Sequence, residues 1–310
     1  FLPLLGGLLL IGFANSSAAL SRYASAEMAE PEHRASAISL VVWANTIGAI
    51  AGPVLVPVAA SLADSLDVAQ LLGPLLVTGL VSAVAGLLLL WLLRPDVREL
   101  AVPDAAPAPD HGRAVAMRVI VRRPPIALAL TAMVVGQVVM VVIMSMTPVH
   151  MTDHGHDLAA VGIVLSAHML GMFALSPLSG WISDRIGDVS AIMASIALLA
   201  VAALISALAP PDGGLLLVAA LFLLGYGWNL GFVGGSALLT DGLAAHERTR
   251  AQGFADTIVW GSSALASLVG GLLLASAGYA ALGVAGMALL AVAAVVLLRM
   301  RASVSPASAS

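Results

Sequence analysis

The sequence contains no cysteine and no lysine, and only 10% of its 310 residues are charged. Without cysteine, the chain can form neither a disulfide bond nor a thiolate metal site. Soluble chains carry about 25% charged residues, so this composition argues against a soluble domain. Aromatic residues make up only 5% of the chain, and no basic stripe interleaved with aromatics indicates a nucleic-acid partner.

Apolar residues are what the chain has in abundance, at 60% of the sequence with a mean hydropathy of +1.04. A membrane-spanning helix needs roughly 20 apolar residues. Runs of this kind occur nine times, and they do not alternate as the strands of a β-barrel do. We therefore expect spanning helices at about 1–21, 36–60, 70–93, 125–150, 158–182, 190–209, 214–239, 251–275 and 278–299.

The 13 basic residues, all Arg, fall in alternate connections between these spans and after the last one. The other connections, at 61–69, 151–157, 210–213 and 276–277, contain no Arg. The positive-inside rule then predicts that the Arg-containing loops and the C-terminus are cytoplasmic. The longest connection, 94–124, holds six Arg and an Ala/Pro stretch, which favours a linker with a short interfacial helix near its end, at 114–123.

An internal repeat relates two of the Arg-containing loops. Residues 32–37 (EHRASA) resemble residues 248–253 (RTRAQG), which places Arg34 and Arg250 216 positions apart. Duplicated halves running in parallel are typical of one transporter architecture. With an offset of 216 residues, the counterparts of the spans within 125–209 would lie before Phe1, so these spans have no repeat partner in the sequence. We therefore expect about 90 further residues, with three spans, before Phe1, for twelve spans in total.

This organisation predicts four parts. Residues 1–93 would be a truncated N-terminal bundle holding spans four to six, and 94–124 a cytoplasmic linker. Residues 125–300 would form a C-terminal six-helix bundle, and 301–310 a cytoplasmic tail.

Two motifs carry a resemblance to a known family. Residues 180–188 (GWISDRIGD) are similar to the cytoplasmic G-x-x-x-D-R-x-G-[RK] motif of the major facilitator superfamily, and residues 48–53 (GAIAGP) to the antiporter G-x-x-x-G-P motif of its exporters. Asp188 stands where that family usually has Arg or Lys, and the Gly-Gly that often follows the second motif is absent. The Arg-containing motif of span four in proton-driven drug exporters does not occur in 1–21.

The resemblance implies an all-α membrane protein built from two bundles, with nine of its twelve helices present. It also implies two groups of site residues. A cytoplasmic gate would comprise Gly180, Asp184, Arg185 and Gly187, with Arg34 and Arg250 beside it, and an antiporter-like element would comprise Gly48, Gly52 and Pro53.

Ionisable groups inside spans are candidates for function, because each costs roughly 2.5–3.5 kcal/mol at the centre of a bilayer. His168 lies near the middle of the fifth span and could carry a coupling proton or contact substrate; alternatively it is a neutral imidazole hydrogen-bonded between helices. Asp256 lies six residues beyond Arg250, about 9 Å into the eighth span. It could couple protons, or it could clamp helices together near a gate.

The amides Gln137, Asn229 and Asn45 also lie within spans. They suit hydrogen bonds to a substrate in a central cavity, and they suit helix–helix hydrogen bonds nearly as well. Three His and two Asp crowd residues 150–157, but their spacing matches no metal signature. We interpret this segment as a solvated loop and expect no metal or cofactor.

The resemblance implies a secondary transporter that works by alternating access, with the proton gradient as its energy source. The favoured interpretation is proton-coupled export of small, partly hydrophobic compounds. The alternative is an importer of a neutral small solute, and a more remote one is a non-transporting membrane sensor or enzyme. No catalytic constellation supports an enzyme. We expect a monomer in a bacterial cytoplasmic membrane, with a small molecule and lipid as its partners and no nucleic acid.

Overall fold

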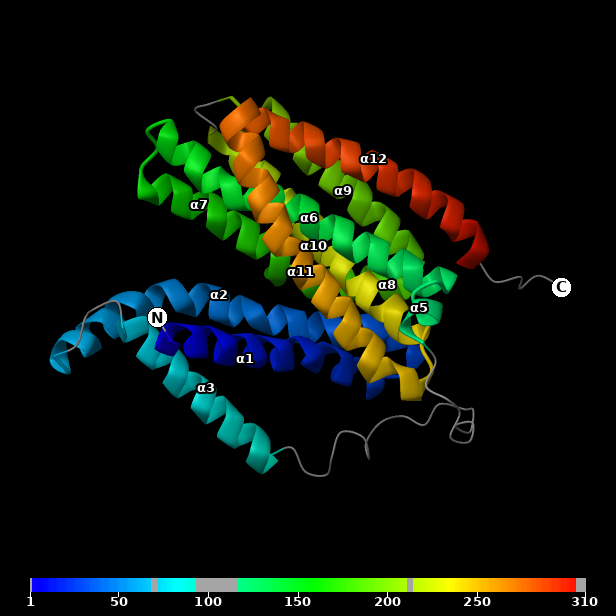
Figure 1. The fold of residues 1–310 in the computed structure, drawn as a ribbon, viewed down its shortest axis with the longest axis horizontal. Coiled ribbons are helices and arrows are strands. Elements are labelled where there is room, and N and C mark those ends of the chain that lie inside the picture. Colours follow the sequence, from blue (N-terminus) through cyan, green and yellow to red (C-terminus); the bar gives the residue numbers. More distant parts are fainter. Residues whose placement is uncertain (1, 68–71, 93–115, 211–213, 305–310) are drawn as a thin grey trace.

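The computed structural model describes residues 2–67, 72–92, 116–210 and 214–304, and within these ranges all regular structure is helical (Figure 1). The linker residues 94–115, and with them Arg94, Arg98 and Arg113, lie outside the described residues. The elements are α1 (Leu2–Glu27), η1 (Pro31–His33), α2 (Arg34–Ser65), α3 (Gly73–Leu92), α5 (Met117–Ile120), α6 (Pro124–Asp153), α7 (Leu158–Met169), η3 (Leu170–Ala174), α8 (Ser176–Ile186), α9 (Asp188–Leu208), α10 (Gly214–Asp241), α11 (Ala245–Ala277) and α12 (Tyr279–Val304).

Seven of the described helices are long and apolar enough to cross a membrane, and the bent pair α7–α8 would make an eighth. A helix satisfies every backbone hydrogen bond within itself, which is what a segment surrounded by hydrocarbon requires. All of the predicted spans coincide with helices, which confirms the all-α membrane class. α1, which falls outside this count, continues to Glu27, beyond the predicted end at residue 21, so Arg22 lies inside a helix and not in a loop.

The helices form a three-helix group (α1–α3) and a larger bundle (α6–α12), joined side by side (Figure 1). α10 is the central helix of the larger bundle, since it packs against α6, α7, α8 and α9, and most of its length is buried. α3 projects from α2 and exposes Leu87, Leu90 and Trp91. Apolar side chains exposed to this extent suit a helix that lies in lipid.

The fifth predicted span is broken in the middle. Residues Leu170–Ala174 form a π-helical turn, and the two halves of the span meet at a bend of 42°. Pro177 in the first turn of α8 and the π-turn are both established causes of kinks. A Cβ added at Gly171 would lie 2.2 Å from the carbonyl oxygen of Phe222. Only glycine therefore lets this turn approach the backbone of α10.

The two groups of helices meet chiefly where α2 packs against α8, with further contacts from α1 to α10 and α11. Within the predicted linker, the described part contains the short helix α5, inside the segment 114–123 where we expected an interfacial helix. α6 begins directly afterwards at Pro124.

Candidate functional site: polar contacts between the two helix groups

The Arg residues of the described helices gather at one end of the molecule. Because successive spans alternate in direction, the end of α1, the starts of α2, α6 and α11, and the ends of α8 and α12 all lie together, on the right in Figure 1. We call this the Arg-rich end. The opposite end holds the ends of α2, α6, α9 and α11 and the starts of α3, α7, α10 and α12, and we call it the Arg-free end.

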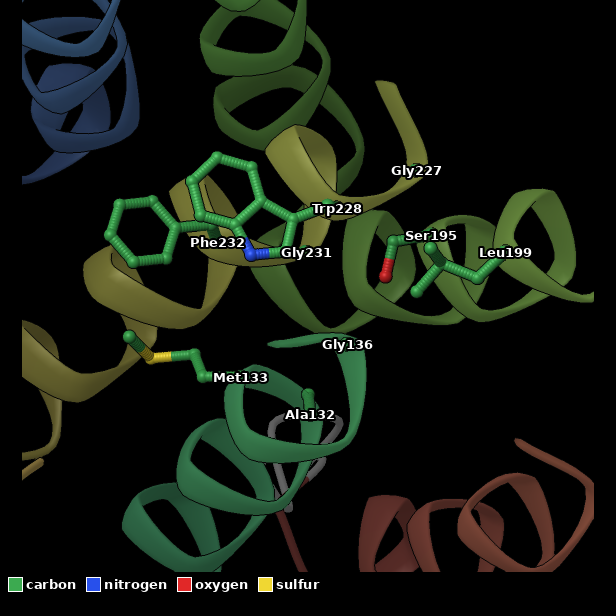
Figure 2. A pocket seen from close by; sticks show the side chains of 9 residues that line it. All are labelled: Ala132, Met133, Gly136, Ser195, Leu199, Gly227, Trp228, Gly231 and Phe232. Carbon is green, nitrogen blue, oxygen red and sulfur yellow. The ribbon is translucent and has the colours of Figure 1, made fainter. Parts of the chain in front are cut away.

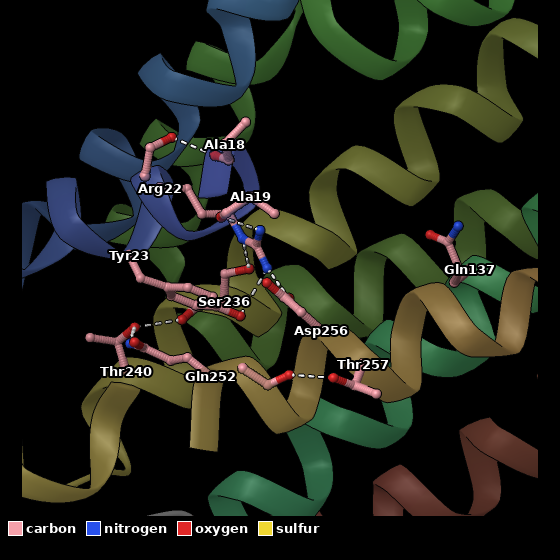
Figure 3. A network of polar contacts seen from close by, with 12 residues as sticks. Ala18, Ala19, Arg22, Tyr23, Gln137, Ser236, Thr240, Gln252, Asp256 and Thr257 are labelled. Carbon is pink, nitrogen blue, oxygen red and sulfur yellow. Dashed lines mark hydrogen bonds and ion pairs between the residues drawn. The ribbon is translucent and has the colours of Figure 1, made fainter. Parts of the chain in front are cut away.

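Arg22 and Asp256 form a buried ion pair between α1 and α11 (Figure 3). Their side chains are 4% and 11% exposed. Arg22 also donates hydrogen bonds to Ser236 Oγ on α10 at 3.2 Å and to the Tyr23 hydroxyl at 2.9 Å. Its guanidinium group lies over the Phe232 ring, 4.5 Å from the centroid. One arginine of the three-helix group is therefore held by two helices of the larger bundle.

Only one half of this pair is recognisable in the sequence. The position of Asp256 predicts either a proton site or a clamp between helices, and the residue does join helices. The sequence does not indicate Arg22 as the partner of Asp256, because the first span is predicted to end one residue before it. α1 stays helical up to Glu27, and this continuation places Arg22 inside the contact.

The predicted gate motif lies where α8 meets α2. Asp184 accepts hydrogen bonds from the backbone amides of Ala35 and Ser36, both at 3.1 Å, so its carboxylate caps the first turn of α2. A Cβ on Gly180 would lie 2.3 Å from Ser39 Oγ, which explains why glycine is needed at this contact.

The remaining residues of the motif shape the turn between α8 and α9. Gly187 has φ +86°, a conformation that glycine adopts without strain. Asp188, the departure from the family pattern, accepts a hydrogen bond from Ser183 Oγ at 2.5 Å. Arg185 is exposed and lies over the Trp181 ring, 5.4 Å from the centroid.

Two further ion pairs lie at the Arg-rich end. Arg34, at the start of α2, pairs with Asp241 at the end of α10, so this contact also joins the two helix groups. Arg123 makes a two-pronged contact with Glu247, at 2.6 and 2.8 Å, which joins the start of α6 to α11. The hydrogen bonds from Arg123 to Glu247 raise the pKa of Arg123. Arg250, grouped with Arg34 by the repeat, is exposed in the first turns of α11.

Gln137 connects three helices in the middle of the larger bundle. Its Nε2 donates to Ser263 Oγ on α11 at 2.8 Å, and its Oε1 accepts from Trp228 Nε1 on α10 at 2.7 Å. Both ends of the amide are therefore used between helices, as the structural alternative predicted. The neighbouring gap between α6, α9 and α10, lined by Gly136 and Phe232 among others (Figure 2), has no room for a water molecule.

His168, on α7 just before the π-turn, and Asn229, on α10, are both fully buried. The Nδ1 of His168 lies 2.9 Å from the carbonyl oxygen of Leu221. Asn229 Nδ2 donates to the carbonyl oxygen of Met172 at 2.6 Å, within the π-turn. These contacts fit the hydrogen-bonding alternative for both residues, and their role in transport stays a prediction.

The residues predicted on α2 lie apart from these contacts. Asn45 is exposed and bonds to the Val42 carbonyl oxygen of its own helix at 3.1 Å. A Cβ on Gly48 or Gly52 would meet no described atom within 4 Å, so the described helices leave this element without a close neighbour. α2 continues through Pro53 to Ser65. The role of the antiporter-like element stays a prediction.

The predicted solvated loop at 150–157 needs one correction. His150 is 8% exposed and belongs to the last turns of α6, where its ring stacks on Tyr279 of α12. Among the described residues, no group of three or more His, Cys, Asp or Glu side chains could hold a metal ion.

Comparison with known proteins agrees with this architecture. The sequence matches the profile of the Major Facilitator Superfamily over residues 1–160 and 139–310. It is 37% and 36% identical to two Bacillus subtilis proteins, the uncharacterized MFS-type transporters YdeG and YddS, and 33% identical to the riboflavin transporter RfnT of Brucella anthropi. Each match covers 89% of the chain, but only 65%, 64% and 67% of the relative, so the chain spans about two thirds of their length. These relatives are named as transporters, not enzymes, and the chain belongs to the major facilitator superfamily.

Proposed function

We propose that the protein is a secondary transporter that moves a small molecule across a bacterial cytoplasmic membrane by alternating access. The observation that carries this proposal is the position of two ion pairs. Arg22–Asp256 and Arg34–Asp241 both join the three-helix group to the larger bundle, and both lie at the Arg-rich end. Two helix groups joined at one end can rock about their contact, opening that end as the other closes.

The Arg-rich end is the cytoplasmic end in this proposal. Cytoplasmic loops of membrane proteins carry an excess of basic residues, and the end of α12 lies at the same end. The described arrangement is then one in which the gate residues Gly180, Asp184, Arg34 and Asp241 close the cytoplasmic side. We propose a monomer, in which both helix groups belong to one chain.

Proton-coupled export is the favoured direction. Asp256 would take up a proton and so lose its ion pair with Arg22. The loss of this pair would release α1 from α11 and favour opening of the cytoplasmic side, where a substrate to be exported enters. The similarity of residues 48–53 to the antiporter motif supports export.

Import of a neutral solute is the second candidate, and one observation supports a neutral solute. One relative, 33% identical, is named a riboflavin transporter, and riboflavin is neutral. It is therefore the first solute to test in either direction.

Cells that express the protein would be loaded with riboflavin and its release followed by fluorescence, with and without a protonophore. We expect release that stops when the protonophore is added and that is lost in Asp256→Asn. The matched control is Asp157→Asn, an exposed carboxylate at the Arg-free end. Release that is indifferent to the protonophore would contradict proton coupling. Net accumulation in place of release would favour the importer.

A further inference from the structure

A pocket of about 530 Å³ opens between α6, α11 and α12 at the Arg-free end. Its apolar walls include Met146 and Val149 of α6 and Leu274 of α11, with Gly271 leaving space between them. This volume lies in the range of sites that hold a drug-sized molecule. The pocket lies far along the bundle from the ion pairs of the Arg-rich end, and nothing in the proposed gate uses it.

Three aromatic rings form a row along one side of this pocket. The rings of Tyr279 and His150 are stacked, with centroids 4.3 Å apart and an interplanar angle of 9°. His154 follows at 4.3 Å from His150 and is tilted by 54°. Tyr279 is held in place by a 2.8 Å hydrogen bond between its hydroxyl and Thr147 Oγ1, and His154 by its Nδ1, 2.8 Å from the His150 carbonyl oxygen. The row is therefore fixed at one end and exposed at His154, where a further ring can stack.

The polar side chain at the edge of the pocket is that of Asp153, which is exposed and lines the pocket. The Nε2 of His150 has no accessible surface, so a ligand in the pocket does not reach it. A wall with imidazole and carboxylate groups does not suit contact with lipid tails.

A metal ion is not the ligand that these groups fit. The described residues contain no cluster of three metal-ligating side chains, and the His150 ring is enclosed between two other rings. What the geometry offers is a flat aromatic surface beside apolar walls, with polar groups at its edge. Planar rings gain from offset stacking in addition to the area that they bury.

We infer that this pocket is a binding site for a planar heteroaromatic molecule, which stacks on His154 and hydrogen-bonds to the exposed carboxylate of Asp153. The inference rests on the proposed function in that this molecule would be the transported solute, held at the outer mouth of the pathway. The site itself is formed by α6, α11 and α12 alone, so binding to it can be measured without transport.

The test uses the purified protein in lipid nanodiscs, with no gradient. Riboflavin, which is neutral, and ethidium, which is a cation, serve as planar probes, and ribitol serves as a probe without a ring. We expect saturable changes in the fluorescence of at least one planar probe and no competition by ribitol. If neither planar probe binds saturably, or if ribitol competes, the inference is wrong.

Variants separate stacking from hydrogen bonding. His154→Leu should weaken binding of the planar probe about three- to tenfold through lost stacking, whereas His154→Phe should restore it. Asp153→Leu keeps all three rings of the row and removes the carboxylate, so it should weaken binding by a similar factor. The matched control is His33→Leu, the same change at an exposed His of the Arg-rich end. Equal binding by His154→Leu and the control would overturn the inference.

The two proposals fail differently. Probe binding that depends on His154, in a protein that neither releases nor accumulates riboflavin in cells, would leave the site and remove the proposal that riboflavin is transported. Riboflavin release that is unchanged in His154→Leu, together with unchanged probe binding, would leave transport and remove the site.

Discussion

At the scale of single residues, buried charges are the features that matter most. Arg22 is 3% exposed and Asp256 is 8% exposed, yet they belong to different helix groups. Removing one partner of such a pair leaves a charge buried without compensation, which costs far more than replacing both partners by apolar groups. A comparison of single and double substitutions therefore distinguishes an ion pair that stabilises the packing of helices from one that does not.

We expect Arg22→Met to destabilise the protein by about 3–5 kcal/mol, because it leaves the Asp256 carboxylate buried and unpaired. The double variant Arg22→Met/Asp256→Leu should recover most of this loss. Thermal unfolding in detergent measures both. Arg250→Met, the same change at an exposed Arg of α11, should cost no more than about 1 kcal/mol. A double variant as unstable as Arg22→Met would contradict the pairing.

At the scale of helices, the contact between α2 and α8 depends on small residues and on one cap. Gly180 allows α8 to approach Ser39, and Asp184 satisfies two amides that the first turn of α2 leaves without helical partners. The motif that resembles a family signature is therefore a packing and capping device between the two helix groups.

Gly180→Ala should destabilise this contact by about 1–3 kcal/mol, because its methyl group would overlap Ser39 Oγ and the two helices would have to separate. Ser39→Gly in the same protein should recover part of the loss, since the Ala35 carbonyl oxygen, 2.8 Å from the added Cβ, remains. The comparison is Gly253→Ala in α11, where a Cβ meets no described atom within 4 Å. Melting temperatures measure all three, and equal effects of the two Gly→Ala changes would show that the contact is not tight.

At the scale of the whole molecule, the proposed alternating access would require the contact at the Arg-rich end to open. The absence of native cysteine makes this measurable, because a single introduced cysteine is the only thiol. Ser39 lies on α2 where this helix packs against α8, and it is 1% exposed. It is therefore a suitable reporter of opening between these two helices.

A cysteine at Ser39 should react slowly with a membrane-impermeant maleimide in the presence of both interhelical ion pairs. Its labelling should become at least severalfold faster in Asp256→Asn and in Asp241→Asn, because each change weakens the closed arrangement. A cysteine at Ser61, exposed near the other end of α2, should label at the same rate in all backgrounds. If Asp256→Asn and Asp241→Asn leave the labelling rate of Ser39→Cys unchanged, this would argue against a gate at this end.

The resemblance in the sequence singled out Gly180 and Asp184, but it did not identify the residues of α2 that they contact. Gln137 was one of three amides with two interpretations, and only the packing of α6 between α10 and α11 decided that both its ends bond to other helices. His150 was assigned to a solvated loop because the same polar residues occur both in a loop and in the last turns of a helix. Its ring is buried because Tyr279, far along the chain on α12, packs against it.

The sequence by itself determined the all-helical membrane class and the approximate places of the apolar helices, because the thickness of a bilayer sets the length of an apolar run. It did not determine which polar groups meet. Arg22 and Asp256 are 234 positions apart, and their contact depends on how far α1 extends and how α1 and α11 pack on α10. The tertiary structure decided this pairing, because interhelical contacts follow from rotation and spacing of whole helices, which no local pattern of residues records.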